Sequence, residues 1–295
     1  MNIENCFLKL LSRIGPRASD QKAYRSHRKS ITSRLKRNFR AHRIELIGSF
    51  KRETAIRDVS DIDLMIILNR EEVKWGNSWK SSTRVLNHLR EQLQDRYWNT
   101  VVGVDKQAVV IRFSDNKHPV DVVPAIYQGL SEKSRFPVYA IPDGLGFWMQ
   151  TSPQAHNKYI IAENKRSKGR LKQTAQIIKY WCECRENSIP LNTFHLELLL
   201  AQERVCNGKT SLAACVHNAL MLLHTRKCRP LTDPVGISAY IKAANSEAKL
   251  VRLRQAVDSW TDRTYKACQA ERNGNVKEAY RLWDLVFNKT LPSFV

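Results

Sequence analysis

The sequence has few of the features that mark secreted or membrane proteins. No run approaches the roughly 18 consecutive apolar residues that a membrane-spanning helix needs. Residues 1–14 lack the basic start and sustained apolar core of a secretory signal. The seven cysteines are odd in number and scattered, and no Cys/His group has zinc-finger spacing. We therefore expect a cytoplasmic protein with reduced thiols, no membrane association and no structural zinc.

Acidic residues are scarce relative to basic ones. There are 28 Asp and Glu against 49 Lys and Arg, a net charge of +21. Such an imbalance favours polyanionic partners, which could be nucleotides, nucleic acid or both. The chain has 295 residues, 42% of them hydrophobic, which is enough for one large domain or two closely packed ones.

Two carboxylates stand where a polar loop enters a strand within residues 44–68. Residues 64–68 favour β-structure and directly follow Asp61-Ile62-Asp63. Because alternate residues of a strand share a face, Asp61 and Asp63 should project together while Ile62 turns into the core. Paired carboxylates repel unless a cation lies between them, and Mg²⁺ prefers such oxygen ligands.

Two further features accompany this pair. The strand before the polar loop ends in Gly48-Ser49, where the glycine allows close approach to a ligand and the serine offers donors to a phosphate oxygen. Residues 109–113 and 120–123 predict two more strands around a turn at 114–119, and Asp121 lies inside the second strand. A buried carboxylate there needs a metal or a cationic partner, and a simple salt bridge is the alternative.

Together, Gly48-Ser49, Asp61-x-Asp63 and the later Asp121 resemble the active site of the DNA polymerase β-like nucleotidyltransferase superfamily. Within it the chain is most similar to the bacterial cGAS/DncV-like nucleotidyltransferases, or CD-NTases. The resemblance implies that the three acids are catalytic and bind two Mg²⁺ ions, with Mn²⁺ as an alternative. It also implies that Gly48 and Ser49 bind the nucleotide.

Two downstream segments extend the resemblance, which spans roughly residues 40–200. Residues 177–181 resemble the family's helix that carries a triphosphate-binding lysine, here Lys179, and 192–195 resemble its Ser-Tyr-His helix start, which makes Thr193 a nucleotide contact. The plainer alternatives are that Lys179 is a helix-edge amine and Thr193 a helix cap. For His195, on an apolar helix, a structural role is favoured over that of a base.

The resemblance implies an α+β fold with a polymerase β-like sheet lobe, a C-terminal helical lobe and an active site in the cleft between them. We expect residues 1–150 to form the nucleotidyltransferase core with a bracing N-terminal helix, and 151–295 the helical domain, which resembles that of oligoadenylate synthetase. Periodicity and turn residues predict the elements. Helices are expected at 19–41, 82–97, 153–186 with a break near Gly169, 194–205, 211–225, 235–244, 246–271 and 275–289, paired strands at 98–104 and 107–113, and a connector at 137–146.

The implied function is synthesis of a cyclic di- or trinucleotide messenger from NTPs, ATP among them. That product would act on a downstream effector in a CBASS-type anti-phage defence system, and a regulatory protein or nucleic acid could control the enzyme. Two alternatives stay open from the basic composition. One is a template-independent polymerase of RNA ends, of the CCA- or poly(A)-adding type, and the other is a catalytically silent nucleic-acid-binding protein.

Overall fold

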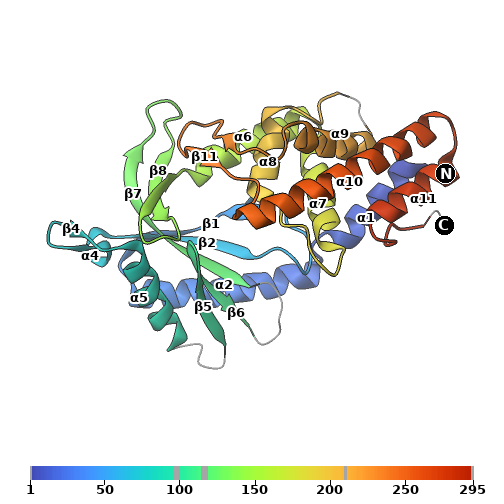
Figure 1. Ribbon diagram of the computed structural model, residues 1–295. Helices are drawn as coiled ribbons and strands as arrows, with labels where there is room; N and C mark the ends of the chain where they lie inside the picture. The colour runs from blue at the N-terminus through green and yellow to red at the C-terminus, as the bar shows by residue number, and fades with distance from the viewer. Residues whose placement is uncertain (1, 96–99, 114–118, 209–210, 294–295) are drawn as a thin grey trace. The chain divides into compact units, whose positions relative to one another are not determined.

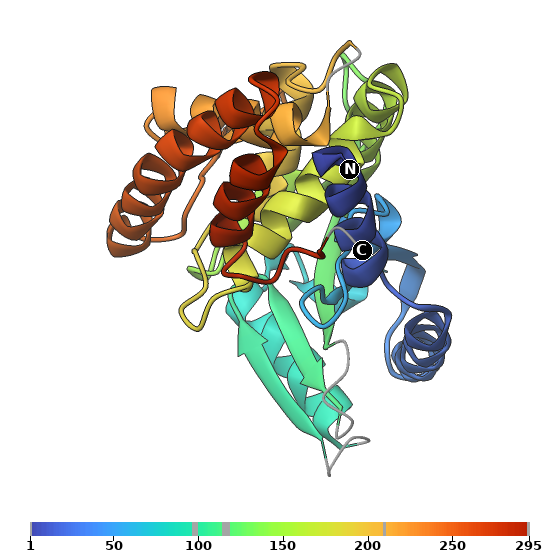
Figure 2. The ribbon, with the colours of Figure 1, turned by 90° about the vertical axis from the view of Figure 1, so that its right-hand side faces the viewer.

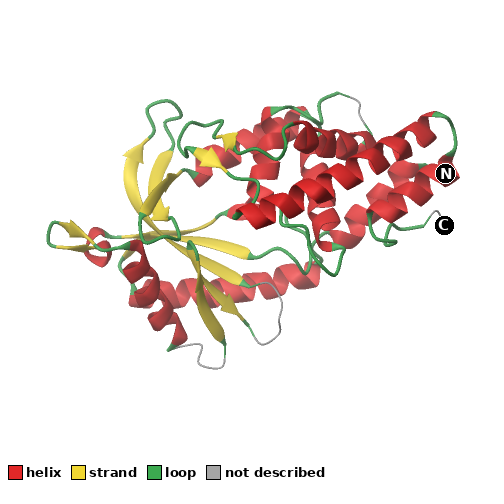
Figure 3. Cartoon of the chain, in the orientation of Figure 1, coloured by secondary structure: helices red, strands yellow, loops and turns green. Residues whose placement is uncertain are grey.

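The computed structural model describes residues 2–95, 100–113, 119–208 and 211–293. The chain divides into two compact units. The sheet unit consists of Pro16–Lys158 and Val235–Ser238, and the helical unit consists of Met1–Gly15, Tyr159–Pro234 and Ala239–Val295. Figure 3 shows the long strands gathered in the sheet unit, whereas helices dominate the helical unit. In the described parts of the chain, no helix is both long and apolar enough to cross a membrane.

A seven-stranded mixed sheet forms the centre of the sheet unit (Figure 1). Its main path runs in the order β1-β2-β7-β6-β5, and β8 pairs with the far part of β7 and with β9. The strands are β1 (Ala41–Leu46), β2 (Ile62–Leu68), β5 (Val101–Asp105), β6 (Ala108–Arg112), β7 (Val120–Leu130), β8 (Pro137–Pro142) and β9 (Trp148–Thr151). Only the β2–β7 pair is parallel among these, so the chain between these two strands forms a crossover.

The two faces of this sheet have different roles because side chains alternate along each strand. One face carries Ile62, Leu64 and Ile66 of β2 and forms the main core with helices α2 (Ala18–Asn38) and α5 (Ser82–Gln94). Figure 1 shows both helices on the same side of the sheet. The opposite face, which we call the acid-bearing face, carries Asp63, Met65 and Ile67 of β2 and the residues in register with them on β1 and β7.

Helix α2 shows why a basic sequence still folds as a packed helix. Tyr24, Ile31 and Leu35 recur at helical spacing and are buried, whereas most of its charged residues lie on the exposed side. Shorter elements complete the unit. They are α3 (Gly48–Lys51), α4 (Arg70–Val73) and the hairpin of β3 (Lys74–Trp75) and β4 (Ser78–Trp79).

The helical unit holds most of the remaining helices. They are α1 (Ile3–Ile14), α7 (Arg170–Glu183), α8 (Thr193–Gln202), α9 (Leu212–Thr225), α10 (Glu247–Arg272) and α11 (Val276–Val286), and α6 (Pro153–Arg166) runs from one unit into the other. Figures 1 and 2 show α10 and α11 side by side. Gly169, at a φ of 88°, separates α6 from α7, which confirms the predicted break.

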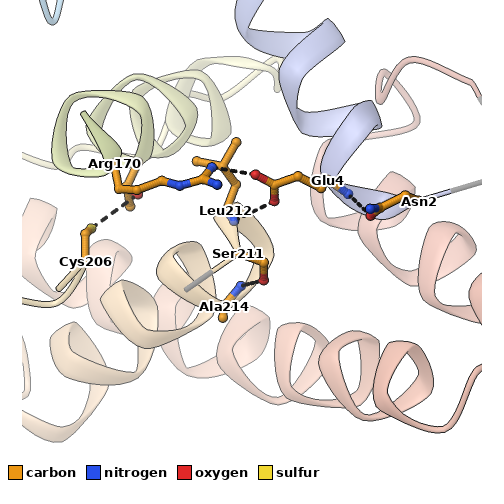
Figure 4. Close-up of polar contacts among 8 residues, drawn as sticks. Asn2, Glu4, Arg170, Cys206, Ser211, Leu212 and Ala214 are labelled. Carbon is orange, nitrogen blue, oxygen red and sulfur yellow. Dashed lines mark hydrogen bonds and ion pairs between the residues drawn. The ribbon is translucent and has the colours of Figure 1, made fainter. Parts of the chain in front are cut away.

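Glu4 ties three helices of this unit together (Figure 4). Its Oε1 lies 2.5 Å from Nη1 of Arg170 on α7. Its Oε2 accepts a hydrogen bond of 2.8 Å from the backbone N–H of Leu212, the first residue of α9. A carboxylate there satisfies a free N–H and complements the positive end of the helix, so α1 is fixed to both α7 and α9.

Two predicted elements are wrong. Residues 137–146 contain strand β8 rather than only a connector, because Pro137 and Pro142 occupy the ends of the strand and leave the four residues between them to pair. Residues 235–244 are not a helix: Gly236 has a φ of 71°, and Tyr240–Ile241 (β11) pairs with Leu231–Thr232 (β10). The predicted elements that fall on 96–99 and 114–118 lie in part outside the described residues.

Candidate active site

The structure brings two of the predicted acids together as direct cross-strand partners. Asp63 on β2 and Asp121 on β7 are paired in the parallel register, at the start of both strands. Asp61 lies two positions before Asp63, immediately before β2 begins. Ile62 is buried in the core, so its neighbours Asp61 and Asp63 point to the opposite face of the sheet. Asp121 pairs with Asp63, so all three carboxylates belong to the acid-bearing face.

The charges of Asp61 and Asp63 both act on Asp121. The pKa of Asp121 is raised from 3.8 to about 7, first by burial and then by the negative charges of Asp61 and Asp63. Its Oδ1 is buried and has no hydrogen-bond partner among the described residues. A carboxylate in this condition is costly to ionise alone, and a cation placed beside it would relieve both the repulsion and the lost hydration.

Gly48 is required for steric reasons at this place. It has a φ of 66°, and a Cβ built on it would lie 1.8 Å from Oδ2 of Asp63. The missing side chain therefore makes the room that the Asp63 carboxylate occupies. Ser49 follows in the short helix α3, and its carbonyl accepts the N–H of Thr54 at 2.9 Å, which helps to close the turn.

One aromatic contact at this turn was missed in the sequence. Tyr24 of α2 stacks on Phe50, with ring centroids 4.7 Å apart and an interplanar angle of 9°. The pKa of Tyr24 is raised by burial, and the charge of Asp63 adds to that shift. Helix α2 thus supports α3 directly beside the acids. The buried position of Tyr24 in the helical pattern indicated packing, but nothing in the sequence identified Phe50 as its partner.

The donor set fits a hard divalent cation, although it is not fully assembled. Three carboxylates are grouped at adjacent strand starts, and one buried oxygen lacks a partner, which is the chemistry that Mg²⁺ selects. Within the described ranges, no three His, Cys, Asp or Glu side chains converge closely enough to hold a metal ion as they stand. Binding would therefore require the carboxylates to rotate toward a common centre.

Lys179 lies in the helical unit, where it forms a buried ion pair. Its Nζ is 2.7 Å from Oε1 of Glu197, and the two side chains are 3% and 0% exposed. The lysine is therefore not a helix-edge amine that reaches solvent. Sequence reasoning missed Glu197, although a single acid within the apolar run of α8 was a signal that it needs a cationic partner.

Thr193 is exposed and is the first residue of α8. The helix is capped by Asn192, whose side chain accepts hydrogen bonds from the N–H groups of Phe194 and His195. His195 is buried, its Nε2 lies 3.2 Å from the carbonyl oxygen of Arg229, and burial lowers its pKa to about 4. A structural role for His195 agrees with this environment.

Comparison with known proteins connects this geometry to a family. A family model described as the Second Messenger Oligonucleotide or Dinucleotide Synthetase domain (SMODS) matches residues 1–164. Over 275 residues the chain is 25% identical to a probable cyclic nucleotide synthase of Bacillus cereus strain VD146, covering 83% of this chain and 81% of that one. It is also 25% identical over 162 residues to the cyclic AMP-AMP-AMP synthase of Escherichia coli strain MS 115-1, covering 52% and 48% of the two chains.

The fold is also similar to that of a solved structure. CdnC of E. coli MS115-1, solved with ATP, has a TM-score of 0.75 and 17% identity to this chain, over 98% of this chain and 99% of that one. The class is therefore a nucleotidyltransferase of the polymerase β-like α+β fold. Within that class, the chain belongs to the SMODS family and is a CD-NTase.

Proposed function

We propose that this protein makes a cyclic di- or trinucleotide from NTPs, with ATP among its substrates, in a reaction that depends on Mg²⁺. The names of the two relatives support a cyclic product, and CdnC has been solved with ATP. The observation that carries the proposal is the pairing of Asp63 with Asp121 in the parallel register, together with the buried Oδ1 of Asp121, which has no hydrogen-bond partner in the described part of the chain. A protein that only binds nucleic acid has no need for clustered carboxylates, because these repel phosphate.

Asp61, Asp63 and Asp121 would hold two Mg²⁺ ions, or Mn²⁺ in their place. The chemistry that the bound metal supplies is a lower pKa for the attacking ribose hydroxyl and charge neutralisation at the departing pyrophosphate. Gly48 has no side chain, so the Asp63 carboxylate can lie directly against it, where a Cβ would clash.

The remaining predicted contacts concern the triphosphate. Ser49 offers a hydroxyl and an N–H directly after Gly48, and a phosphate oxygen could accept both. Lys179 and Thr193 are proposed as phosphate contacts because of the family resemblance. Lys179 also donates a hydrogen bond to Glu197.

The biological setting proposed is a CBASS-type anti-phage system, in which the cyclic product activates an effector. CdnC of E. coli MS115-1 has also been solved in a complex with a HORMA protein. A regulatory protein partner is therefore proposed for this chain as well. The net charge of +21 keeps nucleic acid as a second proposed regulator.

The test is to incubate the purified protein with four labelled NTPs and Mg²⁺, treat the products with phosphatase, and analyse them by chromatography and mass spectrometry. An Asp61→Asn/Asp63→Asn variant is the control. A small phosphatase-resistant product that the control does not make is the expected result. Ladders built only on added RNA would instead establish an RNA-end polymerase, and nuclease-protected nucleic acid without any turnover would establish a silent binder.

A further inference from the structure

A polar network lies on the acid-bearing face beyond the three acids. In the antiparallel β1–β2 register, Glu45 pairs with Met65 and Arg43 pairs with Ile67. Met65 and Ile67 are two and four positions after Asp63 on β2, so they lie on the same face as Asp63, and so do the residues that pair with them. Glu45 and Arg43 therefore lie one and two strand repeats from the Asp63 level, or about 7 and 14 Å along the sheet.

Four polar side chains of this network come from three elements of the sheet unit. Nε of Arg43 lies 2.5 Å from Oε1 of Glu45, and its Nη2 donates a 2.6 Å hydrogen bond to the hydroxyl of Tyr139 on β8. The side-chain amide of Gln154, in the first turn of α6, donates to Oε2 of Glu45 at 2.5 Å and to the Tyr139 hydroxyl at 3.2 Å. Their positions relative to one another are thus fixed by hydrogen bonds.

A buried apolar cluster packs beneath this network and includes the ring of Tyr139. Met65, Ile67, Ala125 and Tyr139 form a separate buried cluster on the acid-bearing face. The ring of Tyr127 stands 6.0 Å from that of Tyr139 and is 50% exposed. A flat aromatic side chain thus remains accessible beside the polar groups.

The network is not saturated by its internal bonds. The Arg43 side chain is 51% exposed and that of Glu45 is 24% exposed, so both present part of their hydrogen-bonding capacity to solvent. A guanidinium has five donors and a carboxylate about four acceptor sites, more than the hydrogen bonds within the network use. Oε1 of Gln154 is buried and has no partner among the described residues. A network with only a structural role would be expected to satisfy such an oxygen.

We propose that Arg43 and Glu45 recognise the edge of a guanine base, with Gln154 and Tyr139 holding them in place and the Tyr127 ring beside the base plane. This inference rests on the proposed function, since the guanine belongs to a nucleotide whose phosphates lie at the three acids. A nucleoside is long enough to extend from the Asp63 level across the following strand repeats.

Guanine is chosen because its edge complements the two charged groups. Its O6 is an acceptor that stands beside the N1–H and N2–H donors, and a guanidinium next to a carboxylate offers the reverse arrangement. Adenine presents one donor beside one acceptor, so it cannot satisfy both oxygens of a carboxylate in this way. Hydrogen bonds to charged groups are stronger than neutral ones, so we expect roughly a 10- to 100-fold discrimination between the two bases.

The experiment compares Arg43→Gln and Glu45→Gln with wild type and with Arg40→Gln. Arg40 is a matched control, because its side chain is exposed and lies 4.0 Å from Glu71, with no other ion pair among the described residues. KM and kcat for pyrophosphate release are measured with GTP and with ATP, and dissociation constants are measured with non-hydrolysable GTP and ATP analogues. Thermal unfolding of each variant identifies a loss of folding.

The expected result is at least a tenfold rise in the KM and dissociation constant for guanine nucleotides in both test variants. The values for adenine nucleotides and for the control should change less than twofold. Equal effects on both bases, or no effect, would overturn the inference, as would a wild type that does not bind the GTP analogue. Absence of pyrophosphate release by wild type would refute the proposed function instead, and the binding constants would still decide whether guanine is recognised.

Discussion

Replacement of Asp121 by Asn should stabilise the metal-free protein while it abolishes the reaction. The pKa of Asp121 in the fold is about 7, against 3.8 for the unperturbed group, and burial is the main cause. Above neutral pH the folded protein must therefore hold a charge that its environment disfavours. About three pKa units at about 1.4 kcal/mol each give a destabilisation of about 4 kcal/mol, which Asn removes.

Because the pKa of Asp121 is raised in the folded protein, this group gives folding stability a distinctive pH dependence. Between pH about 4 and about 7 the unfolded chain has lost the Asp121 proton while the folded chain keeps it, so wild-type stability should fall as pH rises through this window. The Asp121→Asn variant should lack this part of the slope. The difference between the two proteins isolates this group, since all other titrating residues are common to both.

The assay is urea unfolding of both proteins from pH 4 to pH 8 in a chelating buffer, repeated with Mg²⁺. We expect the variant to be the more stable protein at pH 8 without metal, by up to about 4 kcal/mol. Mg²⁺ should stabilise wild type more than the variant, because ligands that bind only the folded state raise its stability. A variant that is less stable than wild type at pH 8 in chelator would refute the electrostatic account of this site.

Three further predictions concern positions around and beyond the acids. Gly48→Ala should reduce pyrophosphate release at least 100-fold, measured at saturating NTP, because its Cβ would meet the Asp63 carboxylate at 1.8 Å; near-normal turnover would contradict this. Lys179→Met should lower the unfolding free energy by about 3–5 kcal/mol, because it removes the cation of a buried ion pair and leaves the Glu197 charge in place, and adding Glu197→Leu should restore most of it in the same urea assay. Glu4→Gln should lower thermal stability by about 1–2 kcal/mol, since it loses an ion pair and weakens a helix cap, and an unchanged melting temperature would show that the contact contributes nothing.

The positions of the three acids on or beside strands could be predicted because the sequence signals for them are local. Asp61 and Asp63 stand beside a strand with a clear apolar pattern, and Asp121 interrupts another such strand. The alternation of strand side chains then gives the face of each. Register is not local, so the strands themselves could not predict that Asp63 pairs with Asp121, and the resemblance implied only that these acids share one site.

Other features depended on tertiary contacts that no short window contains. The buried pair of Lys179 and Glu197 joins two helices, and neither residue alone indicates its partner. Helix α1 was not predicted, although Asn2 caps it and its buried residues recur at helical spacing. Strand β8 was hidden by its prolines, because proline composition indicates a connector unless the paired residues between are considered.

The parallel pairing of β2 with β7 has a consequence for how the protein folds. The two strands are separated in sequence by the whole crossover, so they can meet only after a long loop has closed, which is a slow step in folding. Their acidic ends repel, whereas Ile66 and Ile67, at the other end, gain from burial. The strands should therefore pair first at the apolar end and last at the acids. Divalent cations in the refolding buffer should accelerate this final step.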